Sequence, residues 1–515
     1  MLGADALVKT LADCGVTLCL GNPGTSEMHL VAALDREPRV RPVLCLFEGV
    51  ATGAADGYAR IAGKPAMTLL HLGPGFLNGG AYLHDARRAF SPVINVVGDH
   101  ATTHAHLDAP LASDVEGLVK PLAGWLDAAR TSAESGPKAA AAYAGSLGPP
   151  GCNAFLLLPA DAAWSEGGET SKPQAAPARR APSDVDAVAN AVRAAKKPAV
   201  LLNGDALYAE HLEHAARLQA AGVVVFLDTF ATRQSRGAGR FAPMRLPYFA
   251  EQALAALEGV DLLVTAGTKH PVAFFAYPGK PGELTPENAK RMSLGGPEIS
   301  SAAAVAALAD ALDAPRQGFA LAAPFAPEAP KGALSPETIA TSLARHMPEG
   351  AIVADDSVTA GMSLYPMTAG AAQHDWLFHT GGAIGQGMPM AVGAALAAQE
   401  MKSDRRVLAL CGDGAAAYTL QALWTAAREK LDITFVVFAN KAYRILLVEL
   451  FRTGAGNPGP ASNAMLTLSN PTMEWTHLAQ GFGVPAMRCE TAEDFDRRFA
   501  RAIAQPGPML IEAIV

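Results

Sequence analysis

An aspartate and an asparagine that follow two apolar runs could together hold a divalent cation. Asp413 stands between two glycines after the run Val407–Cys411, and Asn440 follows the run Thr434–Phe438. Carboxylate and amide oxygens are suitable ligands for a hard cation such as Mg²⁺, which in turn binds diphosphates. The two glycines would let backbone N–H groups approach a phosphate at the start of a predicted helix, Ala415–Glu429. The pattern therefore predicts a site for Mg²⁺ and a diphosphate.

A second candidate group is the carboxyl of Glu48, near the other end of the chain. Glu48 follows the apolar run Val43–Phe47, and the segment Leu44–Ala55 contains no Lys, Arg or His. The apolar flank indicates a buried carboxyl, although a glutamate at an exposed helix N-terminus would give the same pattern. A buried carboxyl can hold and release a proton, as general acid–base catalysis requires.

The elements that must position these residues are short apolar runs, which alternate with Ala-rich amphipathic segments along the whole chain. Such runs are typical of parallel strands buried on both faces between helices. We therefore predict an α/β fold of three domains, each with a mainly parallel sheet flanked by helices. The predicted strands are Val43–Phe47, Ala66–His71, Val93–Val97, Phe155–Leu158, Ala199–Leu202, Val223–Leu227, Leu262–Thr265, Ala351–Val353, Val407–Cys411, Thr434–Phe438 and Met509–Ile514.

Two segments without helix or strand periodicity interrupt this alternation. Ser165–Ser183 and Ala314–Leu334 are rich in Pro, Gly and Ala, which is typical of connections between domains. The predicted domains are residues 1–165, 184–313 and 335–515.

The composition excludes several classes of protein. Among 515 residues, 50% are hydrophobic and 17% are charged, with a formal net charge of -8, which argues against disorder and against nucleic-acid binding. The six cysteines contain no Cys-x-x-Cys pair, so we expect neither a disulfide framework nor a structural zinc site, and a cytoplasmic location fits best. We find no signal peptide and no apolar run that could span a membrane.

The chain resembles the acetolactate synthase and benzoylformate decarboxylase superfamily of thiamine diphosphate (ThDP) enzymes. The segment Gly412-Asp413-Gly414, followed after 24 residues by Ala439-Asn440, is similar to the cofactor motif of that family, which has Asn-Asn at the second position. The resemblance implies that the metal ligands are Asp413, Asn440 and the backbone carbonyl of Ala442. It also implies diphosphate contacts from Gly412, Gly414, Ala415 and Thr359, although Thr359 could instead be a simple helix cap.

Other motifs of the superfamily lie in both halves of the chain. Residues 47–60, FEGVATGAADGYAR, resemble the family's glutamate motif, which implies that Glu48 binds the pyrimidine N1′ and assists proton loss from the thiazolium. Residues 380–389, TGGAIGQGMP, resemble the segment beneath the aminopyrimidine ring. There the carbonyl of Gly382 would accept from the 4′-amino group, and Ile384 would hold the cofactor bent unless it is an ordinary core residue.

The resemblance also places a substrate pocket beside the cofactor. The turns at residues 21–25 and 73–75 resemble glycine turns that line the cofactor, and Thr25 matches a pocket serine of benzoylformate decarboxylase. His71 matches a pocket histidine of the same enzyme and could bind a carboxylate or relay a proton. Phe274 stands where that decarboxylase has a second histidine.

Two departures from acetolactate synthase concern the same pocket. Residues 108–112 read DAPLA where that family has D-A-F-Q-E, and Glu449 lies near the position of a tryptophan that selects the second oxoacid. Glu449 is either an acid near the pocket mouth or a member of a solvated helix face. The substitutions favour an aldehyde-forming or mixed carboligation activity over condensation of two pyruvates.

The resemblance implies a ThDP- and Mg²⁺-dependent lyase or carboligase, in which decarboxylation of a 2-oxoacid precedes protonation or C–C bond formation. We predict no FAD, because the middle domain has only single glycine turns. We expect a dimer or a dimer of dimers, because the family builds its site across two subunits, and no nucleic-acid or membrane partner. The alternatives are a catalytically idle homologue acting as a subunit or regulator, and an acyl-CoA lyase that would use Arg233 and Arg236.

Overall fold

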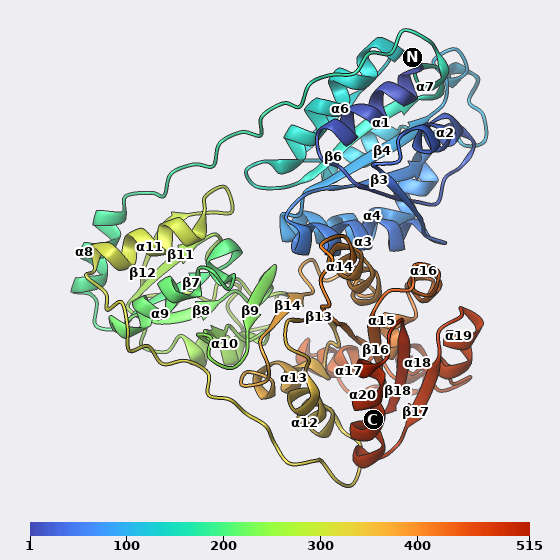
Figure 1. The fold of residues 1–515 in the computed structure, drawn as a ribbon. Coiled ribbons are helices and arrows are strands. Elements are labelled where there is room, and N and C mark those ends of the chain that lie inside the picture. Colours follow the sequence, from blue (N-terminus) through green and yellow to red (C-terminus); the bar gives the residue numbers. More distant parts are fainter.

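Three sheets flanked by helices make up the computed structural model, which describes residues 1–515 (Figure 1). The predicted α/β fold is confirmed. Ten of the strands named above are confirmed, two of them with the predicted bounds, and the predicted strand Val43–Phe47 overlaps β2 only at Val43 and Leu44. The missed strands include the short apolar strand β1 as well as β5 (Trp125–Ala128) and β12 (Lys290–Gly295), which carry polar or charged residues. No helix combines the length and the apolar composition that crossing a membrane requires.

The N-terminal sheet is entirely parallel, with the strand order β2-β1-β3-β4-β6-β5. Its further strands are β1 (Leu18–Gly21), β2 (Arg41–Leu44), β3 (Ala66–His71), β4 (Val93–Asp99) and β6 (Asn153–Pro159). Its helices are α1 (Gly3–Asp13), α2 (Met28–Arg36), α3 (Glu48–Ala62), α4 (Leu72–Ala89), α5 (Val115–Val119), α6 (Ser132–Leu147) and α7 (Ala160–Trp164). Helices α3 and α4 cover the face that looks toward the C-terminal sheet, and α1 and α6 cover the other face (Figure 1).

The middle sheet is also parallel, with the order β10-β8-β7-β11-β12. Its remaining strands are β7 (Pro198–Leu202), β8 (Val224–Leu227), β10 (Met244–Arg245) and β11 (Leu262–Ala266). Its helices are α8 (Val185–Ala194), α9 (Leu212–Ala220), α10 (Ala250–Ala256) and α11 (Ser301–Ala311). Long connections without helix or strand, including residues 167–179 and 318–331, lead into and out of this part of the chain (Figure 1).

The C-terminal sheet has the order β17-β18-β16-β15-β13-β14-β9 and is parallel except for β9. Its strands are β9 (Arg233–Arg236), β13 (Ala351–Asp356), β14 (His374–Phe378), β15 (Val407–Gly412), β16 (Ile433–Ala439), β17 (Ala486–Cys489) and β18 (Met509–Ile514). Strand β9 comes from the middle part of the chain and adds an antiparallel edge. Both Arg233 and Ser235 of this strand bind the carboxylate of Asp375 on β14, which fixes the pairing.

Helices of the C-terminal part differ from the sequence prediction at two places. The helix predicted over Ala415–Glu429 is divided into α15 (Asp413–Ala416) and α16 (Ala422–Arg428). The intervening turn carries Thr419, whose hydroxyl donates to the carbonyl of Gly385 at 2.6 Å. A helix that the sequence analysis did not predict, α18, lies within residues 453–468. The other helices are α12 (Pro336–His346), α13 (Gly361–Met367), α14 (Gly387–Glu400), α17 (Arg444–Arg452), α18 (Pro460–Leu466), α19 (Trp475–Gly481) and α20 (Ala492–Ala504).

The N-terminal and C-terminal parts share one hydrophobic core across helices α3 and α14. A Cβ atom on Gly57 would lie 2.1 Å from the carbonyl oxygen of Met390, and one on Gly393 would lie 1.8 Å from that of Ala54. Two helices can approach this closely only where side chains are absent. The small residues therefore fix the distance between the two sheets.

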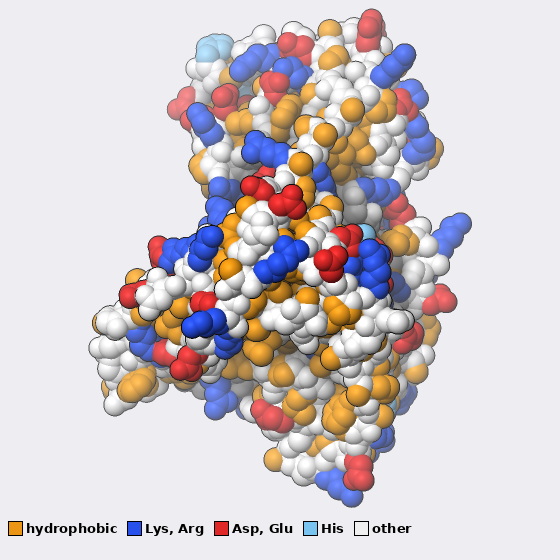
Figure 2. Space-filling model, turned by 90° about the vertical axis from the view of Figure 1, so that its left-hand side faces the viewer, with side chains coloured by type: hydrophobic (Ala, Val, Ile, Leu, Met, Phe, Trp, Pro, Cys, Tyr) orange, Lys and Arg blue, Asp and Glu red, His pale blue; other side chains and the backbone are white.

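The surface carries both signs of charge. On the face shown in Figure 2, Lys and Arg side chains are interspersed with Asp and Glu side chains. No stripe of a single charge sign is visible on this face (Figure 2).

Candidate functional site

His71 lies at the carboxyl end of β3, beside a buried carboxylate that the sequence analysis missed. Its Nδ1 is 2.8 Å from Oε2 of Glu27 and 3.1 Å from the hydroxyl oxygen of Ser26. Glu27 is fully buried and also accepts a hydrogen bond from the backbone N–H of Gly24. A carboxylate at one ring nitrogen fixes the tautomer and orientation of an imidazole and leaves the other nitrogen available for proton transfer. The arrangement can hold or move a proton at His71.

The topology of the sheet explains the contact between Glu27 and His71. Strands β1 and β3 are neighbours, so the turn after β1 lies next to the last residue of β3. Glu27 ends the short 3₁₀ helix Thr25–Glu27 that follows this turn. The side chain of Thr25 is exposed at the same edge of the sheet. The only sequence feature that could have indicated this contact is a glutamate two residues beyond a glycine turn.

Glu48 is the first residue of α3 and is only 6% exposed, so the expected burial is observed. Its Oε2 accepts a hydrogen bond from the side-chain amide of Asn78 on α4 at 3.0 Å. A Cβ atom on Gly75 would lie 3.4 Å from Oε1 of Glu48 and 3.2 Å from Cβ of His71. Glu48 and His71 therefore flank Gly75, and Asn78 is a further polar group of this edge. The turn predicted over residues 73–75 is instead the start of helix α4.

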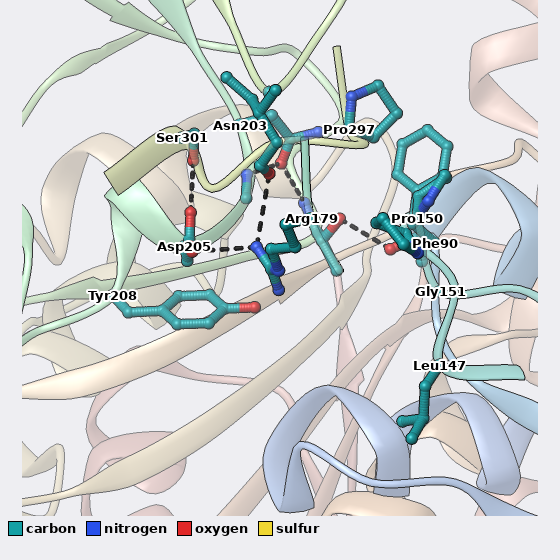
Figure 3. A pocket seen from close by; sticks show the side chains of 16 residues that line it. Phe90, Leu147, Pro150, Gly151, Arg179, Asn203, Asp205, Tyr208, Pro297 and Ser301 are labelled. Atoms are coloured by element: carbon teal, nitrogen blue, oxygen red, sulfur yellow. Dashed lines mark hydrogen bonds and ion pairs between the residues drawn. The ribbon is translucent and has the colours of Figure 1, made fainter. Parts of the chain in front are cut away.

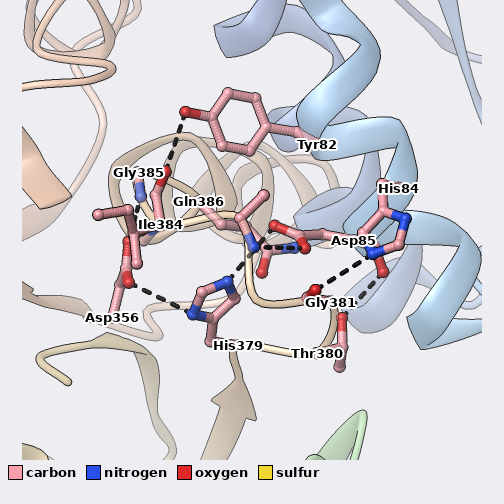
Figure 4. Close-up of polar contacts among 12 residues, drawn as sticks. Tyr82, His84, Asp85, Asp356, His379, Thr380, Gly381, Ile384, Gly385 and Gln386 are labelled. Carbon is pink, nitrogen blue, oxygen red and sulfur yellow. Dashed lines mark hydrogen bonds and ion pairs between the residues drawn. The ribbon is translucent and has the colours of Figure 1, made fainter. Parts of the chain in front are cut away.

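The loop before α14 carries Gly382 and Ile384. Gly382 and Gly385 have φ values of +86° and +99°, which residues with side chains rarely adopt. The carbonyl of Ile384 accepts a hydrogen bond from the hydroxyl of Tyr82 on α4 at 3.3 Å (Figure 4). Gly382 is exposed, whereas the side chain of Ile384 is partly buried. The loop thus presents a free backbone carbonyl and a branched side chain next to each other.

Asp413 and Asn440 come together at the carboxyl edge of the C-terminal sheet, because β15 and β16 are adjacent and parallel. The Asp413 carboxylate accepts from the backbone N–H of Gly414 at 2.9 Å and from that of Lys441 at 2.7 Å. The Asn440 side-chain oxygen accepts from the N–H of Ala442 at 3.0 Å. Burial raises the pKa of Asp413, and the two backbone hydrogen bonds oppose the rise. The carboxylate is thereby oriented without an ionic partner.

The other predicted diphosphate contacts lie at the same edge. Thr359 is in the turn between β13 and α13, and β13 pairs with β15. Gly414 and Ala415 are buried in α15, and a Cβ atom on Gly414 would lie 2.4 Å from the ring of Tyr443. Gly412 faces more open space, since a Cβ atom on it would lie 4.0 Å from its nearest neighbour, the carbonyl oxygen of Ser357.

The single chain does not join the two groups of predicted residues. No hydrogen bond or ion pair links Glu48 or His71 to Asp413 or Asn440. The chain also holds no cluster of three or more His, Cys, Asp or Glu side chains with metal-binding geometry. A metal at Asp413 would therefore depend on amide and backbone oxygens for its other protein ligands.

Aromatic side chains from the middle part of the chain approach the Gly382 loop. A Cβ atom on Gly382 would lie 2.7 Å from the ring of Phe274, which packs against Phe230 and Tyr248. Glu449 on α17 is 8% exposed, and its carboxylate accepts from the hydroxyl of Tyr277 at 2.8 Å. The solvated-face alternative for Glu449 is therefore wrong, because the Tyr277 segment covers this side chain.

A pocket lies between the N-terminal and middle parts of the chain, at the carboxyl ends of β7 and β11 (Figure 3). Asp205 follows β7, and its carboxylate lies at the N-terminus of α11. There it accepts from the N–H of Ala302 at 2.9 Å and from the hydroxyl of Ser301 at 2.8 Å. Arg179 pairs with the same carboxylate at 3.1 Å. The N–H of Ala302 at this helix N-terminus, which could otherwise bind a nucleotide phosphate, thus already has a partner within the chain.

The structure also removes Arg233 and Arg236 as a nucleotide site. Arg236 is 3% exposed, lies over the ring of Tyr365 and donates to its backbone carbonyl. Arg233 forms an ion pair with Asp375 at 2.9 Å. Both guanidinium groups attach β9 to the C-terminal sheet.

Comparisons with known proteins agree with this geometry. The N-terminal TPP binding domain of thiamine pyrophosphate enzymes matches residues 1–119, and the C-terminal TPP binding domain matches residues 358–513. The Mycobacterium tuberculosis protein named "Putative acetolactate synthase large subunit IlvX" is 50% identical over 517 residues, which cover 100% of this chain and 99% of that protein.

More distant proteins are similar over the same length. Benzoylformate decarboxylase of Pseudomonas aeruginosa is 28% identical, over 99% of this chain and 98% of its own. The structure of a ThDP-dependent 4-hydroxybenzoylformate decarboxylase from Rhodococcus jostii shares the fold, with a TM-score of 0.86 and 23% identity over 100% of this chain and 99% of that one. The chain therefore belongs to the family of ThDP-dependent enzymes that includes acetolactate synthase and benzoylformate decarboxylase.

Proposed function

We propose that this protein is a ThDP- and Mg²⁺-dependent lyase or carboligase that acts on a 2-oxoacid. One observation carries the proposal: each half of a ThDP site is assembled at the carboxyl edge of its own sheet. Glu48 and His71 flank Gly75 at the N-terminal sheet, and Asp413 lies beside Asn440 at the C-terminal sheet. Both edges lie where parallel sheets of α/β proteins bind their ligands.

The donor set at the C-terminal edge fits Mg²⁺. Asp413 makes no ion pair within the chain, and burial raises its pKa. The carboxylate therefore has a desolvation cost that the backbone N–H groups and the charge of Lys441 offset only in part. A divalent cation would offset that cost, and the side-chain oxygen of Asn440 and the carbonyl of Ala442 are further hard ligands. Diphosphate oxygens would complete the coordination, next to the backbone of Gly412, Gly414 and Ala415 and the hydroxyl of Thr359.

The N-terminal edge and the loop before α14 fit the aminopyrimidine. Glu48 would hold a proton at the pyrimidine N1′, with Asn78 fixing its carboxyl group. The exposed carbonyl of Gly382 would accept from the 4′-amino group, and Ile384 would support the bend between the two rings. When bound, ThDP supplies a carbon that adds to the 2-oxo group and accepts the negative charge left as CO₂ departs.

We also propose that two copies of the chain form each site. Residues 1–165 of one copy would contribute Glu48 and His71, and residues 335–515 of the other would contribute Asp413 and Asn440, with residues 184–313 as a third domain between them. The lack of a direct contact between the two groups within one chain supports this arrangement. A dimer is then the smallest active form, and a dimer of dimers would keep the same pair of sites.

The balance between aldehyde formation and carboligation is set by the pocket above the cofactor. His71, oriented by Glu27, would bind the substrate carboxylate or move a proton, and exposed Thr25 lies at the same edge. The IlvX relative supports an acetolactate synthase-like reaction. The DAPLA segment and Glu449, which both depart from acetolactate synthase, favour decarboxylation to an aldehyde.

Product analysis tests the proposal. Purified protein with ThDP and Mg²⁺ is given pyruvate and benzoylformate separately, and CO₂, aldehyde and hydroxyketone are measured. CO₂ release that requires the cofactor is the expected result, and the ratio of aldehyde to hydroxyketone separates decarboxylase from carboligase. No CO₂ from a wide panel of 2-oxoacids by a protein that binds ThDP would favour the catalytically idle homologue. Competition by CoA thioesters would favour the acyl-CoA lyase.

A further inference from the structure

A histidine at the end of β14 lies between two carboxylates from different parts of the chain (Figure 4). Nε2 of His379 is 3.6 Å from Oδ2 of Asp85 on α4, and its Nδ1 is 3.5 Å from Oδ1 of Asp356 on β13. The side chains of both aspartates are fully buried. His379 thus connects the N-terminal and C-terminal parts of the chain through two ion pairs.

Both aspartates also bind the backbone of the loop that follows His379. Oδ1 of Asp85 accepts from the N–H of Ala383 at 3.2 Å. Oδ2 of Asp356 accepts from the N–H of Gly385 at 2.8 Å and from that of Gly387 at 3.1 Å. The two carboxylates therefore set the position of Ile384, which lies between these amides, and of Gly382, which directly precedes the first of them.

A protonated His379 offsets one of the two negative charges of Asp85 and Asp356. Burial raises the pKa of Asp356 to about 6, and the charge of Asp85 adds to the rise. Burial also disfavours the imidazolium, but Asp356 and Asp85 together outweigh burial and raise the pKa of His379 to about 9. Oδ2 of Asp85, Oδ1 of Asp356 and Nε2 of His379 have no hydrogen-bond partner, so the ion pairs alone compensate these buried atoms.

Other charged and polar groups around His379 have different partners. Arg60 on α3 pairs with Asp56 and donates to the carbonyl of Phe378 at 2.6 Å. On α4, Nε2 of His84 lies 3.1 Å from the carbonyl oxygen of Gly381, and Tyr82 donates to the carbonyl of Ile384. None of these groups lies between the two aspartates, so none replaces the charge of His379.

We propose that His379 is a positioning residue whose protonated ring joins Asp85 to Asp356 and thereby fixes the loop Thr380–Gly387 in the shape that binds the cofactor. This proposal rests on the proposed function, in which Gly382 and Ile384 contact the cofactor. His379 acts through the two aspartates and needs no contact with the cofactor or the substrate.

A dependence on pH follows from the direction of the shift. Because the pKa of His379 is higher in the folded protein than in the unfolded chain, its stabilisation is fully present below about pH 6.5 and is lost as pH rises through about 9. The amides of the loop should therefore lose protection between about pH 8 and pH 10. This loss concerns the protein without any ligand.

The experiment compares His379→Gln, which removes the charge, with His379→Lys, which keeps a cation. The control is His346→Gln, which breaks the 3.0 Å contact between His346 and Asp496 on the far side of the C-terminal sheet. Amide hydrogen exchange over residues 380–387 is measured without ligand, and the dissociation constant of ThDP is measured by tryptophan fluorescence with Mg²⁺ present. We expect His379→Gln to lower the protection factors of the loop and to weaken ThDP binding, each by about tenfold at pH 7.

The same substitution should abolish the loss of protection above pH 8 that the wild-type protein shows. His379→Lys should recover most of the affinity, and His346→Gln should match the wild type. Wild-type protection and affinity in His379→Gln, or an unchanged step above pH 8, would overturn the proposal. If His379→Gln does not fold, the wild-type protein alone decides: constant protection of its loop up to pH 10 would also overturn the proposal.

The two proposals fail in different ways. If the wild-type protein does not bind ThDP, the proposed function is wrong, but hydrogen exchange in the ligand-free protein still decides the role of His379. If ThDP binds normally to both wild type and His379→Gln, only the positioning role is wrong.

Discussion

Glu27 places a fully buried carboxylate 2.8 Å from Nδ1 of His71. The two residues are 44 positions apart and come from the ends of neighbouring strands. A Cβ atom on Gly98 would lie 1.8 Å from Oε1 of Glu27, so the carboxylate rests directly on the backbone of the next strand. The position of the His71 ring is therefore set by a rigid part of the sheet.

Glu27→Gln should impair turnover and leave cofactor binding unchanged. The amide lacks the charge that orients His71, and we expect kcat/KM for the best 2-oxoacid to fall by about tenfold to a hundredfold. Steady-state kinetics and ThDP titration measure the two effects separately. Glu37→Gln is the matched control, because Glu37 is another buried glutamate of the N-terminal part that pairs with Arg39 instead. Equal kinetics for the two variants would show that Glu27 is only structural.

Asp413→Asn should weaken ThDP binding in the presence of Mg²⁺. The loss of one charged ligand is expected to raise the dissociation constant of ThDP by about tenfold or more and to increase the Mg²⁺ concentration needed for turnover. Asp404→Asn, at an exposed position before the same strand, should behave as the wild type. An Asp413→Asn protein with an unchanged Mg²⁺ requirement would place the metal elsewhere.

The sequence allowed the pair Asp413 and Asn440 to be predicted because both follow strands that are buried on both faces. Such strands have a strong apolar signal, and the parallel order of β15 and β16 brings their ends together. Glu48 was found in the same way, from an apolar run and a segment without basic residues. Local pattern was sufficient to place a single side chain at the end of a single strand.

The contacts of Glu27 and His379 could not be predicted, because each depends on elements that are distant in the sequence. His379 meets Asp85 from α4 and Asp356 from β13, and no local spacing relates the three residues. The break between α15 and α16 has a similar cause, since Thr419 leaves the helix to bind the carbonyl of Gly385. Strand β9 was missed because its pairing with β14 uses buried arginine and serine side chains instead of an apolar run.

Gly57→Ala should destabilise the folded protein. The added methyl group would meet the carbonyl oxygen of Met390 across the α3 and α14 contact, and helix separation would cost about 1–3 kcal/mol of unfolding free energy. Gly80→Ala on α4 is the control, because nothing lies within 4 Å of its Cβ position. This change should increase the unfolding free energy by up to about 1 kcal/mol, since Ala favours a helix more than Gly does. Urea denaturation measures both values. A stable Gly57→Ala protein would mean that the two helices can move apart freely.

Glu48→Gln and Asp413→Asn affect opposite halves of the proposed site, so each variant alone should lose nearly all turnover, by about a hundredfold or more. Each variant should still fold and associate, because neither residue forms an ion pair within the chain. Size-exclusion chromatography of the separate proteins checks this condition.

Mixing these two inactive proteins tests directly whether Glu48 of one chain and Asp413 of another serve one cofactor. After subunit exchange at equal concentrations, half of the dimers carry both variants, and each has one intact site and one doubly substituted site. The account predicts recovery of about a quarter of wild-type turnover. No recovery from mixed dimers whose formation has been verified would contradict it, because the two carboxylates would then have to act within a single chain.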